Sequence, residues 1–231
     1  MTQHRLNRQT LARLMVYRRL LEQLRASGTD YVFSHALGGP LGVTAAQVRR
    51  DVMELGYLGN PAKGYRVTDL LDRIAVVLDA TEAQAAVLVG AGRLGSALVS
   101  YFTNWSPKLK IVGVFDTDPA KVGTEVYGHA CHKLSDLPRV IKRYKVDVGI
   151  IAVPADAAAA VAKTMVDAGV RGVLNFAPVQ LNVPDEVYVE QVDLTVSIER
   201  VAYMARSASA AALPGGSDPG NPVSDDVTSS R

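Results

Sequence analysis

The chain has 231 residues, 48% hydrophobic and 21% charged, which is enough for one large globular domain or two smaller ones with separate cores. It contains no run of about 18 apolar residues and no signal-peptide pattern, which predicts a cytoplasmic protein without membrane contact. Residues 1–66 hold ten Lys and Arg against four acids, whereas the remaining 165 residues hold fifteen against nineteen. A basic N-terminal region on a mildly acidic body favours DNA as partner.

The N-terminal region has the pattern of a helix-turn-helix. Leucines recur at helical spacing over residues 6–26 and predict a first helix. Ser34 is expected to cap a short helix over residues 34–37. After a glycine turn, Thr44 is expected to cap a third helix over residues 45–55. A short helix, a turn and a capped helix in this order are typical of DNA-binding helix-turn-helix domains.

The third predicted helix carries the residues expected to read DNA. Helical spacing places Gln47, Arg50, Asp51 and Glu54 on one polar face, opposite the apolar stripe of Val48, Val52 and Leu55. Glycine and proline punctuate residues 56–67, which predicts a hairpin that serves as a wing. The predicted DNA-binding residues are Thr44, Gln47, Arg49, Arg50 and, in the wing, Lys63. A solvated polar helix in a small interaction domain is the alternative.

From residue 84 onward, apolar strand-like segments alternate with helical segments. This alternation predicts a parallel sheet flanked by helices, after a helical linker over residues 68–80. The predicted strands are 85–89, 111–115, 148–153, 173–176 and 187–192, and the predicted helices are 93–103, 137–144, 155–168 and 193–206. The tail from residue 207 is rich in Ser, Gly, Pro, Asp and Ala and is expected to be disordered. The predicted domains are 1–80, 81–192 and 193–206, followed by the tail 207–231.

Residues 90–95 read Gly-Ala-Gly-Arg-Leu-Gly, the spacing of a dinucleotide-binding loop between a strand and a helix. Gly90 permits a tight turn, Gly92 lets the backbone approach a pyrophosphate, and Gly95 allows close packing of helix and sheet. The next strand ends at Asp116, 21 residues after the last glycine, where a carboxylate accepts from ribose hydroxyls. A carboxylate repels a 2′-phosphate, so NAD+ or NADH is predicted rather than NADP. A Rossmann shell with an empty site is the alternative.

The sequence offers no catalytic group for a nicotinamide enzyme. None of its nine tyrosines has a lysine four residues later, and little chain remains after the strands to build a substrate domain. Strand alternation sends His129 and Cys131 to one face and His132 to the other, so no metal site is predicted. The cofactor is therefore interpreted as a signal. A small NAD-dependent oxidoreductase, or an accessory subunit that binds CoA or a nucleotide over residues 90–179, remains as an alternative.

Five motifs in order over residues 6–205 resemble the Rex family of redox-sensing repressors. They are Val43-Thr44-Ala45-Ala46-Gln47-Val48-Arg49-Arg50-Asp51, Gly56-Tyr57-Leu58-Gly59 with Gly64-Tyr65, the glycine loop, Val114-Phe115-Asp116-Thr117-Asp118-Pro119, and Leu174-Asn175-Phe176-Ala177-Pro178-Val179. The resemblance implies an α/β homodimer with an N-terminal winged helix-turn-helix, a Rossmann sheet and a C-terminal helix, residues 193–206, swapped between subunits. It also implies that the protein binds palindromic operators of respiratory and fermentative genes and releases them when NADH binds.

The same resemblance implies roles for individual residues. Asp116 would contact the adenosine ribose. The pyrophosphate would lie against Gly90, Gly92, Arg93, Leu94 and Gly95, and Ala91 would also bind the cofactor. The sheet edge would be closed by Val153 and Pro154, and the nicotinamide would lie near Asn175, Phe176, Ala177 and Pro178. A switch between cofactor and DNA would involve Arg19, Tyr101 and Asp193. Two departures from the family pattern are Arg50, where Lys is common, and Leu194, where some members carry an aromatic residue.

Overall fold

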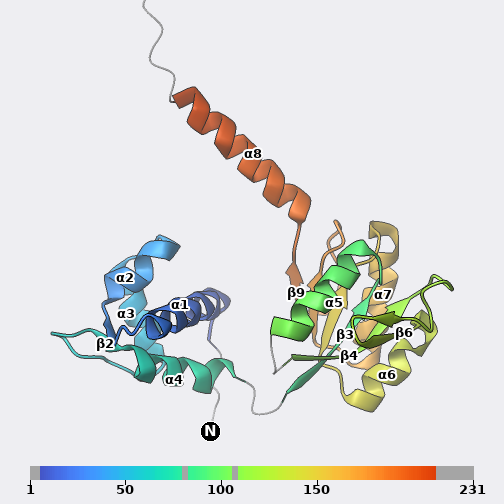
Figure 1. The fold of residues 1–231 in the computed structure, drawn as a ribbon, viewed down its shortest axis with the longest axis horizontal. Coiled ribbons are helices and arrows are strands. Elements are labelled where there is room, and N and C mark those ends of the chain that lie inside the picture. Colours follow the sequence, from blue (N-terminus) through green and yellow to red (C-terminus); the bar gives the residue numbers. More distant parts are fainter. Residues whose placement is uncertain (1–5, 80–82, 106–108, 212–231) are drawn as a thin grey trace, which may run out of the picture. The chain divides into compact units, whose positions relative to one another are not determined.

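The computed structural model describes residues 6–79, 83–105 and 109–211, and the chain divides into two compact units between residues 82 and 83. The first unit is mainly helical (Figure 1). Its short strands pair antiparallel, with Tyr31 opposite Arg66. In chain order its elements are α1 (Arg8–Ala26), β1 (Tyr31–Val32), α2 (Ser34–Gly38), the 3-10 turn η1 (Gly39–Leu41), α3 (Ala45–Glu54), β2 (Tyr65–Arg66) and α4 (Val67–Leu78).

The turn and the caps of the first unit follow from particular side chains. Gly42 ends η1 with φ 64°, in the left-handed region that favours glycine. Thr44 caps α3 as predicted, because its hydroxyl accepts from the backbone N–H of Gln47 at 3.2 Å. The predicted capping role of Ser34 is wrong. Phe33 occupies the cap position of α2, and the Ser34 hydroxyl accepts from Arg49 Nη1 at 3.3 Å.

One apolar core joins the helices of the first unit. Leu14 and Leu21 of α1, Val48 of α3 and Ile74 of α4 are fully buried in it. Their helical spacing produces the buried stripe on each helix, and burying each such side chain stabilises the fold by about 1.5–3 kcal/mol. The core holds α3 against α1, so the opposite side of α3 faces solvent.

The predicted hairpin before β2 is present. Asn60 and Gly64 exchange two backbone hydrogen bonds of 2.7 Å each, and the Asn60 side-chain oxygen accepts from the backbone N–H groups of Ala62 and Lys63 at the tip. Gly64 has φ 82°, and a Cβ there would overlap the carbonyl oxygen of Val32. A glycine is therefore required where the hairpin crosses β1.

The second unit is a seven-stranded sheet in the order β5-β6-β4-β3-β7-β8-β9, parallel except that β5 runs antiparallel to β6. The strands are β3 (Gln84–Val89), β4 (Leu109–Asp116), β5 (Glu125–Val126), β6 (His129–Lys133), β7 (Val148–Ile151), β8 (Gly172–Asn175) and β9 (Tyr188–Gln191). The helices are α5 (Arg93–Trp105), α6 (Leu137–Tyr144), α7 (Ala155–Ala168) and α8 (Leu194–Ala211), with a 3-10 turn η2 (Leu134–Asp136) before α6.

Alternation along the central strand divides the core between the two faces of the sheet. Val87 and Val89 of β3 pack with Ile141 of α6 and Met165 of α7. Leu88, which points to the other face, packs with residues of the cluster that includes Val99 of α5. The sheet thus lies between α5 on one face and α6 and α7 on the other (Figure 1). The carboxyl ends of β3, β4 and β7 meet at one edge, where parallel sheets bind ligands.

Cys131 lies in β6 and is 2% exposed, a burial that is typical of free cysteine. Helix α8 continues to Ala211, so the predicted helix end at 206 was too early and the prediction of disorder was wrong for residues 207–211. Residues 212–231 lie outside the described part of the chain. Within the described part, no helix is long and apolar enough to cross a membrane, and no cluster of metal-ligating side chains is found.

Candidate functional site

Two glycines, Gly90 in the loop after β3 and Gly95 in the first turn of α5, are required by the packing of the unit itself. Gly90 has φ 102°, and a Cβ on it would overlap the carbonyl oxygen of Ala152 beyond β7. A Cβ on Gly95 would overlap the carbonyl oxygen of Gly90. These contacts bring the first turn of α5 close to the strand ends, so that its backbone N–H groups are available to an anion.

Gly92 differs from these two glycines, because no neighbouring protein atom would clash with a side chain at this position. A Cβ on Gly92 would have no neighbour within 4 Å, and the residue lines a cleft of about 350 Å³ at the strand ends. The cleft is lined by Val89, Gly90, Gly92, Asp116, Thr117, Lys121, Leu134, Ala152, Val153, Pro154, Ala157 and Val161. The open space at Gly92 fits a ligand group that approaches the backbone closely, as a pyrophosphate does.

Asp116 ends β4 at the rim of this cleft and is held by three donors. Its Oδ2 accepts from the backbone N–H of Ala91 at 2.8 Å and from Lys121 Nζ at 3.0 Å, and its Oδ1 accepts from the N–H of Asp118 at 2.9 Å. Burial alone would raise the pKa of this carboxyl, but the three hydrogen bonds lower it overall below its ordinary 3.8. Asp116 is therefore ionised at neutral pH and can accept from ribose hydroxyls.

Lys121 is a charged cleft residue that sequence reasoning missed. Its ammonium lies 3.0 Å from Asp116 Oδ2 and 3.8 Å from Asp118 Oδ2, and its pKa is raised, chiefly by the hydrogen bond to Asp116. The side chain is 37% exposed. A lysine five positions after Asp116 is a signal in the sequence that could have predicted this contact. A turn after the strand brings a residue at that distance back to the carboxylate.

The structure brings together some of the predicted cofactor residues and separates others. Gly90, Gly92, Asp116, Val153 and Pro154 line one cleft. Other predicted residues are not among its lining. Ala91 is buried in the loop before α5, and Gly95 is buried in the first turn of α5, where Arg93 and Leu94 are exposed. Asn175 ends β8, and residues 176–178 follow it. A contact of these residues with a cofactor stays a prediction.

The Asn175 side chain, predicted to lie near the nicotinamide, is fully buried and holds the loop after β8. Its Nδ2 donates to the carbonyl oxygen of Val179 at 2.8 Å and to Gln191 Oε1 at 2.7 Å, and its Oδ1 accepts from the Ala177 N–H at 3.1 Å. Gln191 Nε2 in turn donates to the Ala177 carbonyl at 2.8 Å. The amide thus ties the loop to β9.

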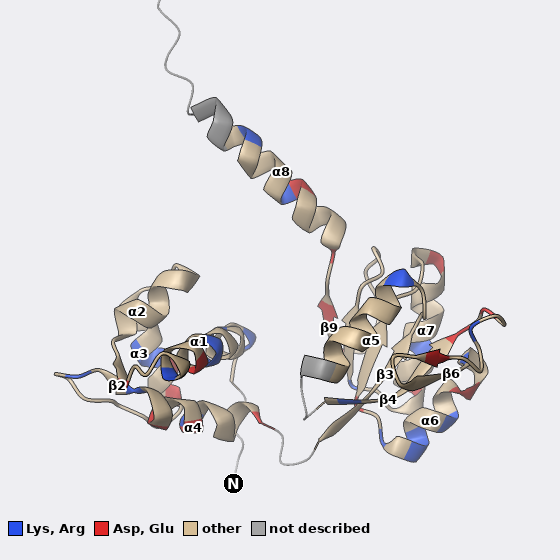
Figure 2. Ribbon diagram, viewed as in Figure 1, with Lys and Arg blue, Asp and Glu red and all other residues tan. Residues whose placement is uncertain are grey.

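A second candidate site lies on α3 and the hairpin of the first unit. Arg49, Arg50 and Thr44 are exposed on α3, and Lys63 is exposed on the hairpin, with its ammonium 5.6 Å from the centre of the Tyr31 ring. Figure 2 shows basic residues on α1, on α3 and along the hairpin. A groove of about 300 Å³ between α3 and the hairpin is lined by Arg49, Ser34 and Asn60, among others. Such a surface suits contacts with phosphates.

The expected place of Asp51 on the exposed face of α3 is wrong. Its side chain is fully buried, because Arg13 and Tyr17 of α1 lie across it and donate hydrogen bonds to it. Gln47, predicted as a DNA contact, is partly buried and also donates to Asp51. The polar face of α3 is therefore divided between internal and external contacts.

The three predicted switch residues lie on separate elements. Arg19 is exposed on α1 of the first unit, and Tyr101 is 56% exposed on α5, where its ring packs edge-on against Phe102. Asp193 precedes α8, and its Oδ1 accepts from the N–H of Val196 at 2.9 Å. Asp193 therefore acts as a helix cap in this chain, a role that the sequence prediction had not assigned.

A winged helix-turn-helix joined to a unit with a dinucleotide cleft defines a DNA-binding protein that responds to a ligand. Residues 6–52 match the family "Putative DNA-binding protein N-terminus" and residues 81–179 match "CoA binding domain". The redox-sensing transcriptional repressor Rex of Carboxydothermus hydrogenoformans is 44% identical over 85% of this chain and 95% of its own length. That of Desulforamulus reducens is 42% identical over 84% and 92%.

Solved structures agree with these relatives. The chain resembles RSP, a Rex-family repressor, in complex with NAD+ and operator DNA, with a TM-score of 0.81, 30% identity, and coverage of 89% of this chain and 94% of RSP. RSP in complex with NADH matches with a TM-score of 0.79 at the same identity, over 89% and 97%. The chain belongs to the Rex family of redox-sensing transcriptional repressors, as its motifs had indicated.

Proposed function

We propose that this protein is a homodimeric repressor that binds operator DNA through α3 and the hairpin and leaves the DNA when NADH binds the cleft of the second unit. The observation that carries the proposal is the cleft itself, in which an open Gly92 and an ionised Asp116 lie at the ends of adjacent parallel strands. RSP, which shares the fold, has been crystallised with NAD+ and operator DNA together and, separately, with NADH.

On the cofactor side, the pyrophosphate and the adenosine ribose each have a matching part of the cleft. The pyrophosphate would lie over Gly92 at the start of α5, where backbone N–H groups face an anion. Asp116 would accept from the adenosine ribose hydroxyls, and Val153 and Pro154 would close the edge. The nicotinamide changes charge and shape between its oxidised and reduced forms, which is the signal that the protein would read.

On the DNA side, Arg49, Arg50 and Lys63 would contact phosphates or base edges, with Thr44 at the start of α3. The exposed guanidinium and ammonium groups and the basic charge of residues 1–66 support this assignment. A homodimer would present two such units to a palindromic operator. The bacterial cytoplasm, where operator DNA is found, is the compartment in which we expect the protein to act.

We assign α8 to the dimer, as a helix exchanged between subunits. The apolar side chains Leu194, Val196, Ile198, Val201, Tyr203 and Met204 are between 47% and 63% exposed in the isolated chain. Large apolar side chains gathered on one helix are typical of an interface. A protein truncated before Leu194 is expected to be monomeric in analytical ultracentrifugation.

We infer that the dinucleotide acts as a signal and not as a reagent. The curated relatives are named as transcriptional repressors, and the cleft lining contains no histidine, cysteine or tyrosine to act as acid or base. An oxidoreductase would turn over NADH with a substrate. The family model named for CoA binding leaves a second ligand class to exclude, and the ribose-binding position of Asp116 favours NAD(H).

The experiment is a gel-shift titration of a palindromic operator with NADH, NAD+ and CoA in parallel. NADH is expected to release the DNA at concentrations at which NAD+ and CoA do not. Release by CoA alone would show that CoA and not NADH is the signal, and DNA binding that responds to none of the three would contradict the proposal.

A further inference from the structure

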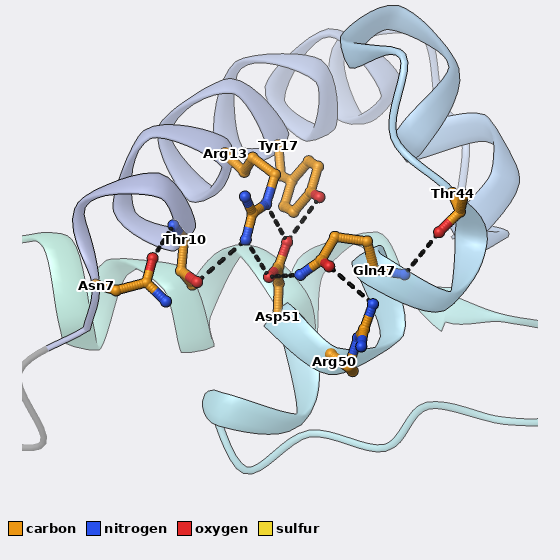
Figure 3. Close-up of polar contacts among 8 residues, drawn as sticks. All are labelled: Asn7, Thr10, Arg13, Tyr17, Thr44, Gln47, Arg50 and Asp51. Carbon is orange, nitrogen blue, oxygen red and sulfur yellow. Dashed lines mark hydrogen bonds and ion pairs between the residues drawn. The ribbon is translucent and has the colours of Figure 1, made fainter.

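The carboxylate of Asp51 lies at the centre of a hydrogen-bond network between α1 and α3 (Figure 3). It is fully buried, although it shares α3 with the exposed Arg49 and Arg50. Arg13 donates to both of its oxygens, from Nε at 2.6 Å and from Nη2 at 2.7 Å, and the Tyr17 hydroxyl donates to Oδ2 at 2.9 Å. The charge of Asp51 is therefore paired inside the unit.

Gln47 makes the fourth hydrogen bond to this carboxylate, with its Nε2 2.9 Å from Asp51 Oδ1. Burial would raise the pKa of Asp51, but the hydrogen bonds from Arg13, Gln47 and Tyr17 lower it overall, so the group is ionised and can only accept. The amide nitrogen of Gln47 must then face Asp51, which turns the amide oxygen outward. That oxygen accepts from Arg50 Nη2 at 2.9 Å.

We propose that Asp51 is a positioning residue for Arg50 and acts through Gln47. The contacts run from a buried ion pair to an exposed guanidinium: Asp51 orients the Gln47 amide, and the amide holds one arm of Arg50 (Figure 3). An exposed arginine loses many rotamers when it binds, and a side chain already held in place loses fewer. This inference rests on the proposed DNA contact of α3.

The network also changes the predicted role of Gln47. A glutamine that reads adenine uses its amide oxygen and its amide nitrogen together. In this structure the oxygen is bonded to Arg50 and the nitrogen to Asp51. An adenine contact of this kind would have to replace both bonds and leave the buried carboxylate with one donor fewer. Gln47 is thus a link between Asp51 and Arg50.

A double-mutant cycle of operator binding tests the link between Gln47 and Arg50. Gln47→Ala leaves the bonds of Asp51 to Arg13 and Tyr17 in place, so the unit is expected to stay folded in thermal unfolding. Alone it is expected to weaken binding about tenfold, and in a protein that already carries Arg50→Ala by no more than about twofold. Arg49 is the matched control, because its guanidinium donates to the Ser34 hydroxyl and lies outside the contacts of Gln47 with Asp51 and Arg50. Gln47→Ala and Arg49→Ala are expected to be additive.

The outcomes separate the inference from the function on which it rests. If Gln47→Ala is non-additive with both Arg50→Ala and Arg49→Ala, it disturbs α3 in general. If it is fully additive with Arg50→Ala, Gln47 acts independently of Arg50. Either result overturns the inference and leaves DNA binding by α3 standing. If neither arginine substitution weakens operator binding, the assignment of α3 itself fails.

The first link of the network is tested with Arg13→Gln combined with Asp51→Asn, which removes both charges of the ion pair together and leaves neither unpaired. In this background Arg50→Ala is expected to weaken binding by a smaller factor than in the unmodified protein, while Arg49→Ala has its full effect. An undiminished effect of Arg50→Ala in the folded variant would overturn the role of Asp51.

Discussion

The site of the second unit is formed mainly by backbone, and the site of the first unit by side chains. At the dinucleotide cleft, most of the geometry is backbone: Gly90 and Gly95 are needed for the turn, and Gly92 leaves space for the ligand. On α3 the site consists of side chains, and the contacts of Gln47 and Arg50 depend on what α1 presents to Asp51. The glycine spacing of the cleft can therefore be recognised within a short stretch of sequence, whereas the side-chain contacts of α3 depend on Arg13, 38 positions away from Asp51.

Substitutions of Gly95 and Gly92 are expected to differ most in their effects, because a Cβ would meet protein atoms only at Gly95. Gly95→Ala would force a Cβ into the Gly90 carbonyl, so we expect it to lower the free energy of unfolding of the second unit by about 3 kcal/mol and to abolish NADH binding. Gly92→Ala meets no protein atom and is expected to change stability by less than about 0.5 kcal/mol while weakening NADH binding. Urea unfolding followed by the single tryptophan, Trp105, and calorimetric titration measure the two effects. Equal stability of the two variants would contradict the packing argument.

Substitutions on α3 are expected to affect the first unit and leave the second unit unchanged. Arg49→Ala and Arg50→Ala are expected to weaken operator binding severely and to leave NADH affinity unchanged, because both residues belong to the first unit. Each lost phosphate contact should also lower the slope of log affinity against log salt by about one. Gel shifts at several salt concentrations measure this, with Lys110→Ala, an exposed lysine of β4, as control. Unchanged operator affinity in both arginine variants would contradict the DNA-binding assignment of α3.

A smaller effect tests how the units communicate. Asp193→Ala, Arg19→Ala and Tyr101→Phe are expected to weaken the effect of NADH on operator affinity by about 1–3 kcal/mol, and NADH binding itself by less. Because Asp193 also caps α8, Asp193→Asn is the matched control: it can still accept from Val196 but carries no charge. Operator affinity is measured with and without saturating NADH in each variant, and the ratio of the two affinities gives the effect of NADH. An undiminished NADH effect in all variants would remove this switch but not the repressor function.

The smallest expected effect concerns the preference of the cleft for NADH over NADPH. Asp116→Ala is expected to reduce the preference for NADH over NADPH about tenfold, because it removes the carboxylate that repels a 2′-phosphate and leaves Lys121 without its main partner. Adding Lys121→Ala should weaken NADPH binding again. Calorimetric titration with each cofactor measures both changes. If the unmodified protein already bound NADPH as tightly as NADH, Asp116 would not be the discriminating group.

Local patterns in the sequence were enough for most of the fold and for the centre of the cleft. The glycine spacing and the strand ending at Asp116 predicted residues that line one cleft, and Thr44 was recognised as a cap because capping depends on neighbours three positions apart. The sequence did not predict the burial of Asp51, because its main partner, Arg13, lies 38 positions away on another helix. Lys121 was missed because its contact needs the turn after Asp116.

One consequence of the Asn175 side chain concerns how movement is transmitted within the second unit. Asn175 accepts from the N–H of Ala177, Gln191 donates to the carbonyl oxygen of Ala177, and the two amides are bonded to each other. The loop after β8 and the end of β9 are therefore linked. Gln191 lies two residues before Asp193, where α8 is capped. A displacement of Ala177 must therefore either break these hydrogen bonds or pull on the chain that leads into α8.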